Sequence, residues 1–484
     1  MSKHNGFAGK DMYGAEMISE RGKQAAGGLA PTEEKKHKGF ASKLGFVLAA
    51  AGSAVGLGNL WRFPYLAAKY GGGAFILCYL ILAVTFGFCL LVLEIAIGRR
   101  TGKNIIGAFS ALNRKFKWLG ILTLVVPIII VPYYCVIGGW VTNYIYAFAA
   151  GDSMLVGEGA SVATSQEYFN GFISNPWMPI VFFLIFALIT VFVVVFGVQK
   201  GIERMSKILM PALAAIAIAL MIYVLCQPGA LDGLKVLFIP NFENFKIETL
   251  LAALGQLFYS MSLAMGIMIT YGSYMKKDAK ITSSARQISI CDSAFAIVAA
   301  VIIIPSIFAF SDDPQNAMAQ SGPSLMFVQL PAVFNNIAGG RWLGMVFFVL
   351  VFFAALTSSI SLVETIVAVL KSNGLSRAVS CMIVFGLMLI LGALSSLGYG
   401  PLSMIKIGDM QLLDFFDYIS NSIIMPIVAI GTCVVAGYFC DTRLIMDEAG
   451  LIGKPTRTYF RIMIRYVAPV CMALILISGI FMDL

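Results

Sequence analysis

The chain has 484 residues, of which 59% are hydrophobic and only 12% are charged. A soluble domain carries about 25% charged residues, so this composition excludes an ordinary soluble enzyme or binding domain. The net charge of +9 does not indicate a nucleic-acid partner, because the basic residues follow the membrane pattern described below.

Residues 1–40 form a polar, glycine-rich segment of mixed charge, which predicts a disordered cytoplasmic tail. Residues 41–484 contain recurring apolar blocks, and about 20 consecutive apolar residues are enough to cross a bilayer. The blocks predict an all-α polytopic membrane domain of about eleven transmembrane helices. The expected spans lie near residues 43–69, 74–98, 119–149, 177–196, 205–226, 249–275, 284–310, 341–370, 377–397, 411–438 and 459–481.

The loops between these spans alternate in charge. Lys and Arg cluster in every second loop, whereas the loop 151–175 contains three acidic residues and no basic one. This is the positive-inside pattern, and it predicts a cytoplasmic N-terminus. No Asn-X-Ser/Thr glycosylation site occurs in the chain, so we expect a multi-pass protein of a bacterial inner (plasma) membrane.

The first and sixth expected spans are interrupted by residues that weaken a helix. Span 1 contains Gly52, Gly56 and Gly58, and span 6 contains Gln256, two serines and Gly266. Non-helical backbone is tolerated at membrane depth only where protein buries it or where it lines a cavity. Interrupted segments five spans apart predict a 5+5 inverted repeat, about 43–226 and 249–438, with an additional helix at about 459–481. The two breaks would expose free N–H and C=O groups that can bind ions and polar ligands near the bilayer midplane.

Three motifs carry a family resemblance. AGSAVGLGNLWRFPYLAAKYGGGAF (51–75), GQLFYSMSLAMGIMITYGSY (255–274) and FFAALTSSIS (352–361) resemble the neurotransmitter:sodium symporter family, specifically its bacterial amino-acid transporter branch. The resemblance covers about residues 40–480. It implies the LeuT-like fold with broken helices 1 and 6, and a sodium-coupled symporter that imports a neutral, hydrophobic or aromatic amino acid by alternating access.

The resemblance also implies a substrate site built from both breaks. The substrate carboxylate would meet the N–H groups of Leu57 and Gly58 and the hydroxyl of Tyr134. The substrate ammonium would meet Ala54, Tyr259, Ser260 and Ser262. The side-chain pocket would be lined by Ile130, Tyr134, Tyr259, Met265, Ser359 and Leu362.

Two sodium sites are implied in the same way, since a hard cation takes carboxylate, carbonyl and hydroxyl oxygens. The first would use Ala54, Asn59, Ser260 and Asp292 together with the substrate carboxylate. The register of span 7 also allows Cys291, but a thiol is a poor sodium ligand. The second site would use Gly52, Val55, Ala354, Thr357 and Ser358.

Chloride is not expected as a cofactor, because Ala296 stands where chloride-dependent relatives have serine and Asp292 can supply the negative charge itself.

Arg62 and Asp417 match the outer gate of the family, an ion pair that closes over the site. The inner gate does not match, since Ser372 stands in place of the acidic partner.

Two other classes of function remain open from the sequence. One is a proton-coupled amino-acid carrier on the same fold, with Asp292 or Glu364 as the relay, and the other is a non-transporting amino-acid sensor or a channel. An enzyme is not expected, because the chain has no nucleotide-binding loop, no CxxC motif and only two histidines. The expected partners are a small-molecule amino acid and the lipid bilayer, with no nucleic acid.

Overall fold

The computed structural model describes residues 39–242, 245–311, 313–319, 322–335 and 339–481. These residues are helical almost throughout, and no strand occurs among them beyond two isolated bridges. Gly39 onward forms one compact unit. The expected tail therefore lies outside the described residues except for its last two positions.

Nine helices in the described ranges are long and apolar enough to cross a membrane. On one side of each helix, hydrophobic side chains pack against other helices. The side chains on the outer sides are also largely apolar but are exposed, as expected for contact with lipid. The nine are Gly73–Thr101 (α4 and α5), Arg114–Ala150 (mainly α7), Met178–Val195 (α9), Val198–Leu225 (mainly α10), Ile281–Phe310 (α14), Gly340–Ser372 (α17), Arg377–Leu397 (α18), Leu412–Phe439 (α19 and α20) and Lys454–Phe481 (α22 and α23).

Two further spans are broken. The first consists of α2 (Lys43–Ala54) and the segment Gly58–Lys69, which contains α3 (Phe63–Lys69), and the two parts are bent by 52°. The second consists of α12 (Ile247–Ser260) and α13 (Ile267–Ser273), with residues 261–266 non-helical between them. Among the described residues, the nine helices and the first broken pair give ten candidate spans by length and composition, and α12 with α13 occupies the position of the eleventh predicted span. The predicted fold class is confirmed.

The connections between the spans contain short helices. Their ends are set by local signals: in α8, the Ser161 side chain accepts from the N–H of Thr164, whose hydroxyl accepts from the N–H of Ser161. The short helices are α6 (Ile105–Leu112), α8 (Val162–Ser174), α11 (Ala230–Phe238), α15 (Pro314–Ala319), α16 (Leu330–Asn335) and α21 (Thr442–Glu448).

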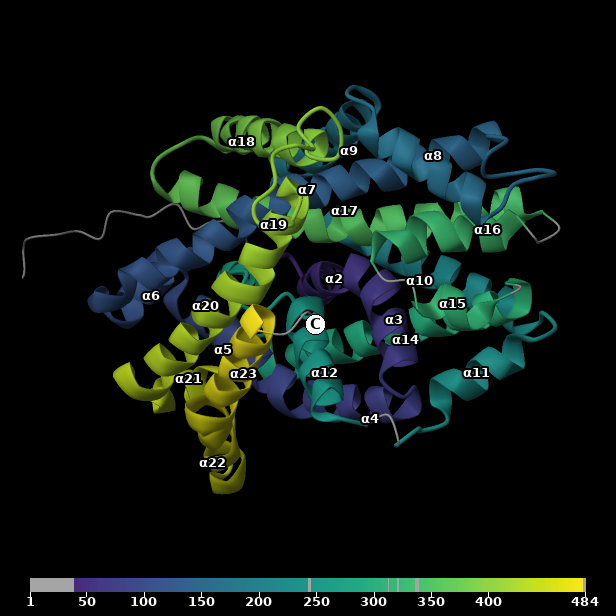
Figure 1. The fold of residues 1–484 in the computed structure, drawn as a ribbon. Coiled ribbons are helices and arrows are strands. Elements are labelled where there is room, and N and C mark those ends of the chain that lie inside the picture. Colours follow the sequence, from purple (N-terminus) through teal and green to yellow (C-terminus); the bar gives the residue numbers. More distant parts are fainter. Residues whose placement is uncertain (1–38, 243–244, 312, 320–321, 336–338, 482–484) are drawn as a thin grey trace, which may run out of the picture. The chain divides into compact units, whose positions relative to one another are not determined.

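The broken spans lie inside the bundle. Helix α2 packs against α10, α14 and α17, α12 packs against α4, and α13 packs against α5, while the two longest helices, α7 and α17, run against each other (Figure 1). Phe40, just before α2, is buried and makes edge-on ring contacts with Phe46 and Tyr271. Its N–H donates to the carbonyl of Tyr274 at 3.1 Å, so the start of the first span is tied to the end of the sixth.

Candidate binding site at the helix breaks

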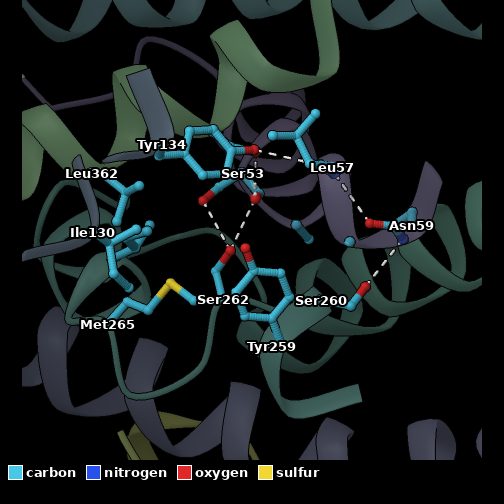
Figure 2. A pocket seen from close by; sticks show the side chains of 15 residues that line it. Ser53, Leu57, Asn59, Ile130, Tyr134, Tyr259, Ser260, Ser262, Met265 and Leu362 are labelled. Carbon is cyan, nitrogen blue, oxygen red and sulfur yellow. Dashed lines mark hydrogen bonds between the residues drawn. The ribbon is translucent and has the colours of Figure 1, made fainter. Parts of the chain in front are cut away.

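A cavity lies where the two breaks face α7 and α17 (Figure 2). Its volume is about 30 Å³. The space is therefore narrow, and its lining combines polar backbone on one side with apolar and aromatic side chains on the other. The lining residues are Ser53, Ala54, Gly56, Leu57, Gly58, Asn59, Ile130, Tyr134, Tyr259, Ser260, Ser262, Met265, Ile267, Ser358 and Leu362.

Ten of the eleven residues expected around the substrate line this cavity. The exception is Ser359, which is buried but turned away. Its hydroxyl donates to the carbonyl of Leu356 at 3.0 Å and lies 3.0 Å from the hydroxyl of Thr190. Ser358, one residue earlier on α17, faces the cavity instead. Each residue turns an α-helix by about 100°, so Ser359 points away from the direction of Ser358.

Hydrogen bonds join the two breaks across the cavity. The Ser262 hydroxyl donates to the carbonyl of Ser53 at 2.9 Å, and the two side-chain hydroxyls lie 3.3 Å apart. Beside this contact, the N–H of Leu57 points to the hydroxyl of Tyr134 at 3.5 Å (Figure 2). These are backbone groups that an unbroken helix would have used internally.

Asp292 of α14 is fully buried beside the first break. One carboxylate oxygen accepts from the Asn59 amide at 2.8 Å and from the Ser260 hydroxyl at 2.5 Å, and the other accepts from Tyr79 at 3.0 Å. Three of the four protein residues expected at the first sodium site are thus in direct contact. Cys291, the alternative, is only partly buried.

A second cluster of oxygens surrounds the Ser358 hydroxyl. The carbonyls of Gly52, Ser53, Val55 and Ala354 lie 3.4, 3.1, 3.5 and 3.2 Å from it. The Thr357 hydroxyl also contacts the Ala354 carbonyl at 3.1 Å. A hydroxyl has one hydrogen to donate, so it cannot satisfy four carbonyls. The carbonyl lone pairs that it leaves free are suited to a cation, although this cluster contains no acidic side chain. All five residues expected at the second sodium site meet here.

The predicted outer gate is not closed as an ion pair. Within the described ranges Arg62 and Asp417 do not approach to 4.0 Å, and Asp417 instead accepts from the Tyr133 hydroxyl at 2.8 Å and from the Asn421 amide at 2.6 Å. Sequence reasoning missed Tyr133 and Asn421. Asn421 follows Asp417 by one helical turn, a spacing that could have identified it.

Glu94 is a second residue that sequence reasoning missed. It is buried in α5, and its carboxylate accepts from the N–H of Ala264 in the sixth-span break at 2.7 Å. A carboxylate within an apolar span is itself a signal of function, because burying it in a membrane is costly.

A helical membrane protein with two interrupted spans and a polar cavity between them has the architecture of a secondary transporter. Residues 37–153 and 173–483 match the sequence model of the Sodium:neurotransmitter symporter family. The chain belongs to this family, whose members are sodium-coupled transporters and not enzymes, and it is a sodium-dependent symporter embedded in the membrane.

Individual relatives agree. The uncharacterized sodium-dependent transporter YhdH of Bacillus subtilis is 37% identical over 396 residues, which cover 81% of this chain and 86% of that protein. An uncharacterized sodium-dependent transporter of Haemophilus influenzae is 30% identical over 93% of this chain and its own full length. The crystal structure of MhsT in complex with L-phenylalanine superposes with a TM-score of 0.82 at 35% identity, over 92% of this chain and 100% of MhsT. MhsT shares the LeuT-like fold.

Proposed function

We propose that the chain imports a neutral, hydrophobic or aromatic amino acid together with sodium by alternating access, and that residues 41–484 form the transporter domain. The observation that carries the proposal is the cavity at the two breaks. One wall offers backbone groups of both signs, and the other consists of Ile130, Met265, Leu362 and two tyrosines. The phenylalanine bound by MhsT is an amino acid of this class.

A zwitterion fits the polar wall because the two breaks offer opposite partial charges. The N–H groups of Leu57 and Gly58 begin a new helical segment and would bind the carboxylate beside Tyr134. The ammonium would lie near the carbonyl of Ala54, at the end of α2, and near Tyr259, Ser260 and Ser262. The narrow cavity requires some side chains to yield, and Met265 is the most adaptable of them.

Two sodium ions would bind beside the substrate. Asp292, Asn59, Ser260 and the Ala54 carbonyl supply the first site, where the substrate carboxylate would complete the shell. Shared coordination makes each ligand strengthen the binding of the other, which is the physical basis of coupled transport. The oxygens around Ser358 supply the second site, and both oxygen sets have the chemistry that a hard cation prefers.

Chloride would not be required. The Asp292 carboxylate receives the hydroxyls of Tyr79 and Ser260, so these donors already have a fixed negative charge to bind. Ala296, one helical turn further on, offers no hydroxyl. Uptake in proteoliposomes should therefore be equal in sodium chloride and in sodium gluconate, and a strong dependence on chloride would contradict this part of the proposal.

Arg62 and Asp417 would form the outer gate in a more closed state. The charge of the loops supports a cytoplasmic N-terminus in an inner membrane. Proton relay through Glu364 has less support. The Glu364 carboxylate is fully buried, is in an ion pair with Arg377 and accepts from the Tyr274 hydroxyl at 2.8 Å.

The decisive experiment is thermal unfolding of the purified protein with each of the twenty amino acids, in sodium and in potassium. Neutral apolar or aromatic amino acids should raise the unfolding midpoint in sodium alone. Uptake of the best ligand into proteoliposomes should then follow an imposed sodium gradient at fixed pH. Stabilisation by the same ligand in potassium, or uptake driven by a pH gradient without sodium, would refute the proposal.

A further inference from the structure

A second cavity lies far along the chain from the helix breaks. It is a groove of about 610 Å³ between the connection from α21 to α22 and the first turns of α22 (Lys454–Ile462). Its lining residues are Leu451, Ile452, Gly453, Lys454, Arg457, Thr458 and Arg461. None of these residues belongs to the proposed transport site.

The groove is strongly basic. Lys454, Arg457 and Arg461 follow one another by three and four residues and so share a face of the helix. Asp447 forms an ion pair with Arg457. For Lys454 and Arg461 no ion-pair partner lies within 4.0 Å in the part of the chain that the structure describes, and the Arg461 Nε is buried there without a hydrogen-bond acceptor. Cations one helical turn apart repel each other, so the groove is suited to an anion.

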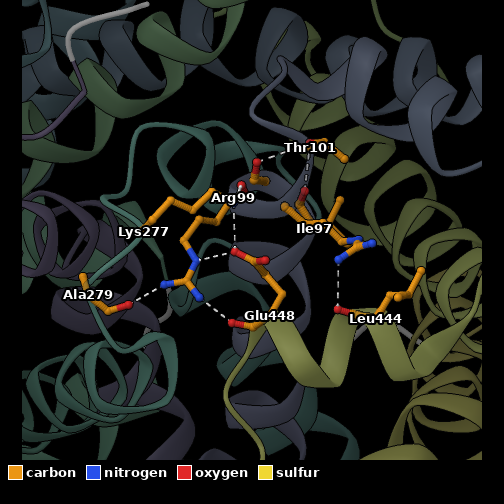
Figure 3. Close-up of polar contacts among 9 residues, drawn as sticks. Ile97, Arg99, Thr101, Lys277, Ala279, Leu444 and Glu448 are labelled. Atoms are coloured by element: carbon orange, nitrogen blue, oxygen red, sulfur yellow. Dashed lines mark hydrogen bonds and ion pairs between the residues drawn. The ribbon is translucent and has the colours of Figure 1, made fainter. Parts of the chain in front are cut away.

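The neighbouring carboxylate of α21 is already engaged elsewhere (Figure 3). Glu448 accepts from the Nε of Arg99 at 2.7 Å and from the Nζ of Lys277 at 3.2 Å. Arg99 also donates to the carbonyls of Glu448 and Ala279. These bonds hold α21 against the end of α5, on the face that carries the basic loops, and leave Glu448 unable to neutralise the groove.

The helix that begins in the groove is the last span. Only 28% of its most apolar 18-residue stretch is buried, the lowest share among the long helices that the structure describes. Its exposed apolar side chains lie on the side of the helix away from the basic residues: Tyr459, Ile462, Tyr466 and Val470. The basic groove thus lies at the level where a span enters the membrane, on the face that carries the basic loops. Basic pockets at this level bind the phosphate headgroups of anionic lipids.

We propose that this groove binds the phosphate headgroup of an anionic phospholipid from the leaflet that contacts the basic loops. Lys454 and Arg461 contact the phosphate oxygens, and the uncapped N-terminus of α22 contributes free N–H groups. The proposal does not depend on which substrate the protein transports.

The test is retention of phosphatidylglycerol by the full chain, measured by native mass spectrometry and by titration of the unfolding midpoint against phosphatidylcholine. The groove variant is Lys454→Gln with Arg461→Gln. The matched control is Lys103→Gln with Lys115→Gln, which removes two exposed positive charges on the same basic face but outside the groove. A third variant, Lys454→Arg with Arg461→Lys, keeps the charge and reports whether changes at these positions alone disturb folding.

Each cation is worth about fivefold in affinity for an anionic surface, so the groove variant should bind phosphatidylglycerol about 25-fold more weakly. The control and the charge-conserving variant should stay within about twofold of the unmodified protein. Equal losses in the groove and control variants would overturn the proposal. Protection by inorganic phosphate as strong as that by phosphatidylglycerol would also overturn it, in favour of a free anion.

Discussion

Replacement of Ser358 by alanine tests the second sodium site most directly. The Ser358 hydroxyl lies 3.1–3.5 Å from four carbonyls, three of them in the broken first span and one in α17, so it would contribute one oxygen ligand to the proposed sodium site. A contact between a polar group and a charge is worth about 1.5–3 kcal/mol, which corresponds to about 10- to 150-fold in sodium affinity. Ser358→Ala should therefore raise the half-maximal sodium concentration by a factor in this range.

Sodium affinity can be measured without knowing the substrate, because an ion that binds only the folded state raises the unfolding midpoint with concentration. The matched control is Ser359→Ala, the same deletion one residue further along α17. The Ser359 hydroxyl bonds to Leu356 and Thr190 and not to the carbonyls of the break, so its sodium dependence should shift by less than about twofold. Equal shifts in the two variants, or a larger one in Ser359→Ala, would refute the assignment of this site.

Three further changes test other parts of the structure. Gly98→Ala should lower the unfolding midpoint, because the added Cβ would lie 1.9 Å from the backbone carbonyl of Ile269 and force α5 and α13 apart. The expected loss of stability is about 1–3 kcal/mol or more, and an unchanged midpoint would contradict this close packing. Tyr133→Phe removes the 2.8 Å hydrogen bond to Asp417 and should speed dissociation of radiolabelled substrate by about fivefold, whereas an unchanged rate would exclude Tyr133 from the gate. Burial by itself would raise the pKa of Glu448, but hydrogen bonds from its two basic partners outweigh burial and lower the pKa below its usual 4.5. The resulting stabilisation is present above pH 4.5 and is lost as pH falls through the folded-state pKa, so the stability deficit of Glu448→Gln should be largest near pH 7 and should shrink as pH falls below 4.5. A deficit that does not change with pH would disprove the electrostatic origin.

The eleven spans and the two breaks could be predicted because the bilayer imposes a length and a polarity on every spanning segment. Gly56 and Gly58 in one apolar run, and Ser262 and Gly266 in another, conflict with continuous lipid-facing helix. The expected and observed ends of most spans differ by only a few residues. The short helices of the connections were not predicted, although the Ser161–Thr164 capping pair is visible in the sequence.

The side-chain contacts of the site depend on how each helix is rotated about its axis, which the apolar periodicity does not determine. Three consecutive hydroxyl residues occur at 357–359, and nothing in that run shows which of them faces the breaks. The same holds for the two adjacent tyrosines of α7: Tyr134 reaches the first break, whereas Tyr133 reaches Asp417. A rotation of about 100° separates neighbouring residues, so an error of one residue moves a side chain to another partner.

The sixth-span break is held open by other helices and not by glycine alone. Ser262 and Ala264 have φ values of 53° and 59°, a left-handed conformation that costs a non-glycine residue about 1–2 kcal/mol. Two hydrogen bonds offset this strain, one from the N–H of Ala264 to Glu94 and one from the Ser262 hydroxyl to the carbonyl of Ser53.

The second of these bonds ends on the same carbonyl that faces Ser358, so the sixth-span break and α17 share an acceptor in the first span. An ion that draws this carbonyl toward itself would weaken its bond to Ser262 and change the strain at the sixth-span break. The proposed sodium site on one side and the proposed substrate site on the other would then be coupled through a single peptide group.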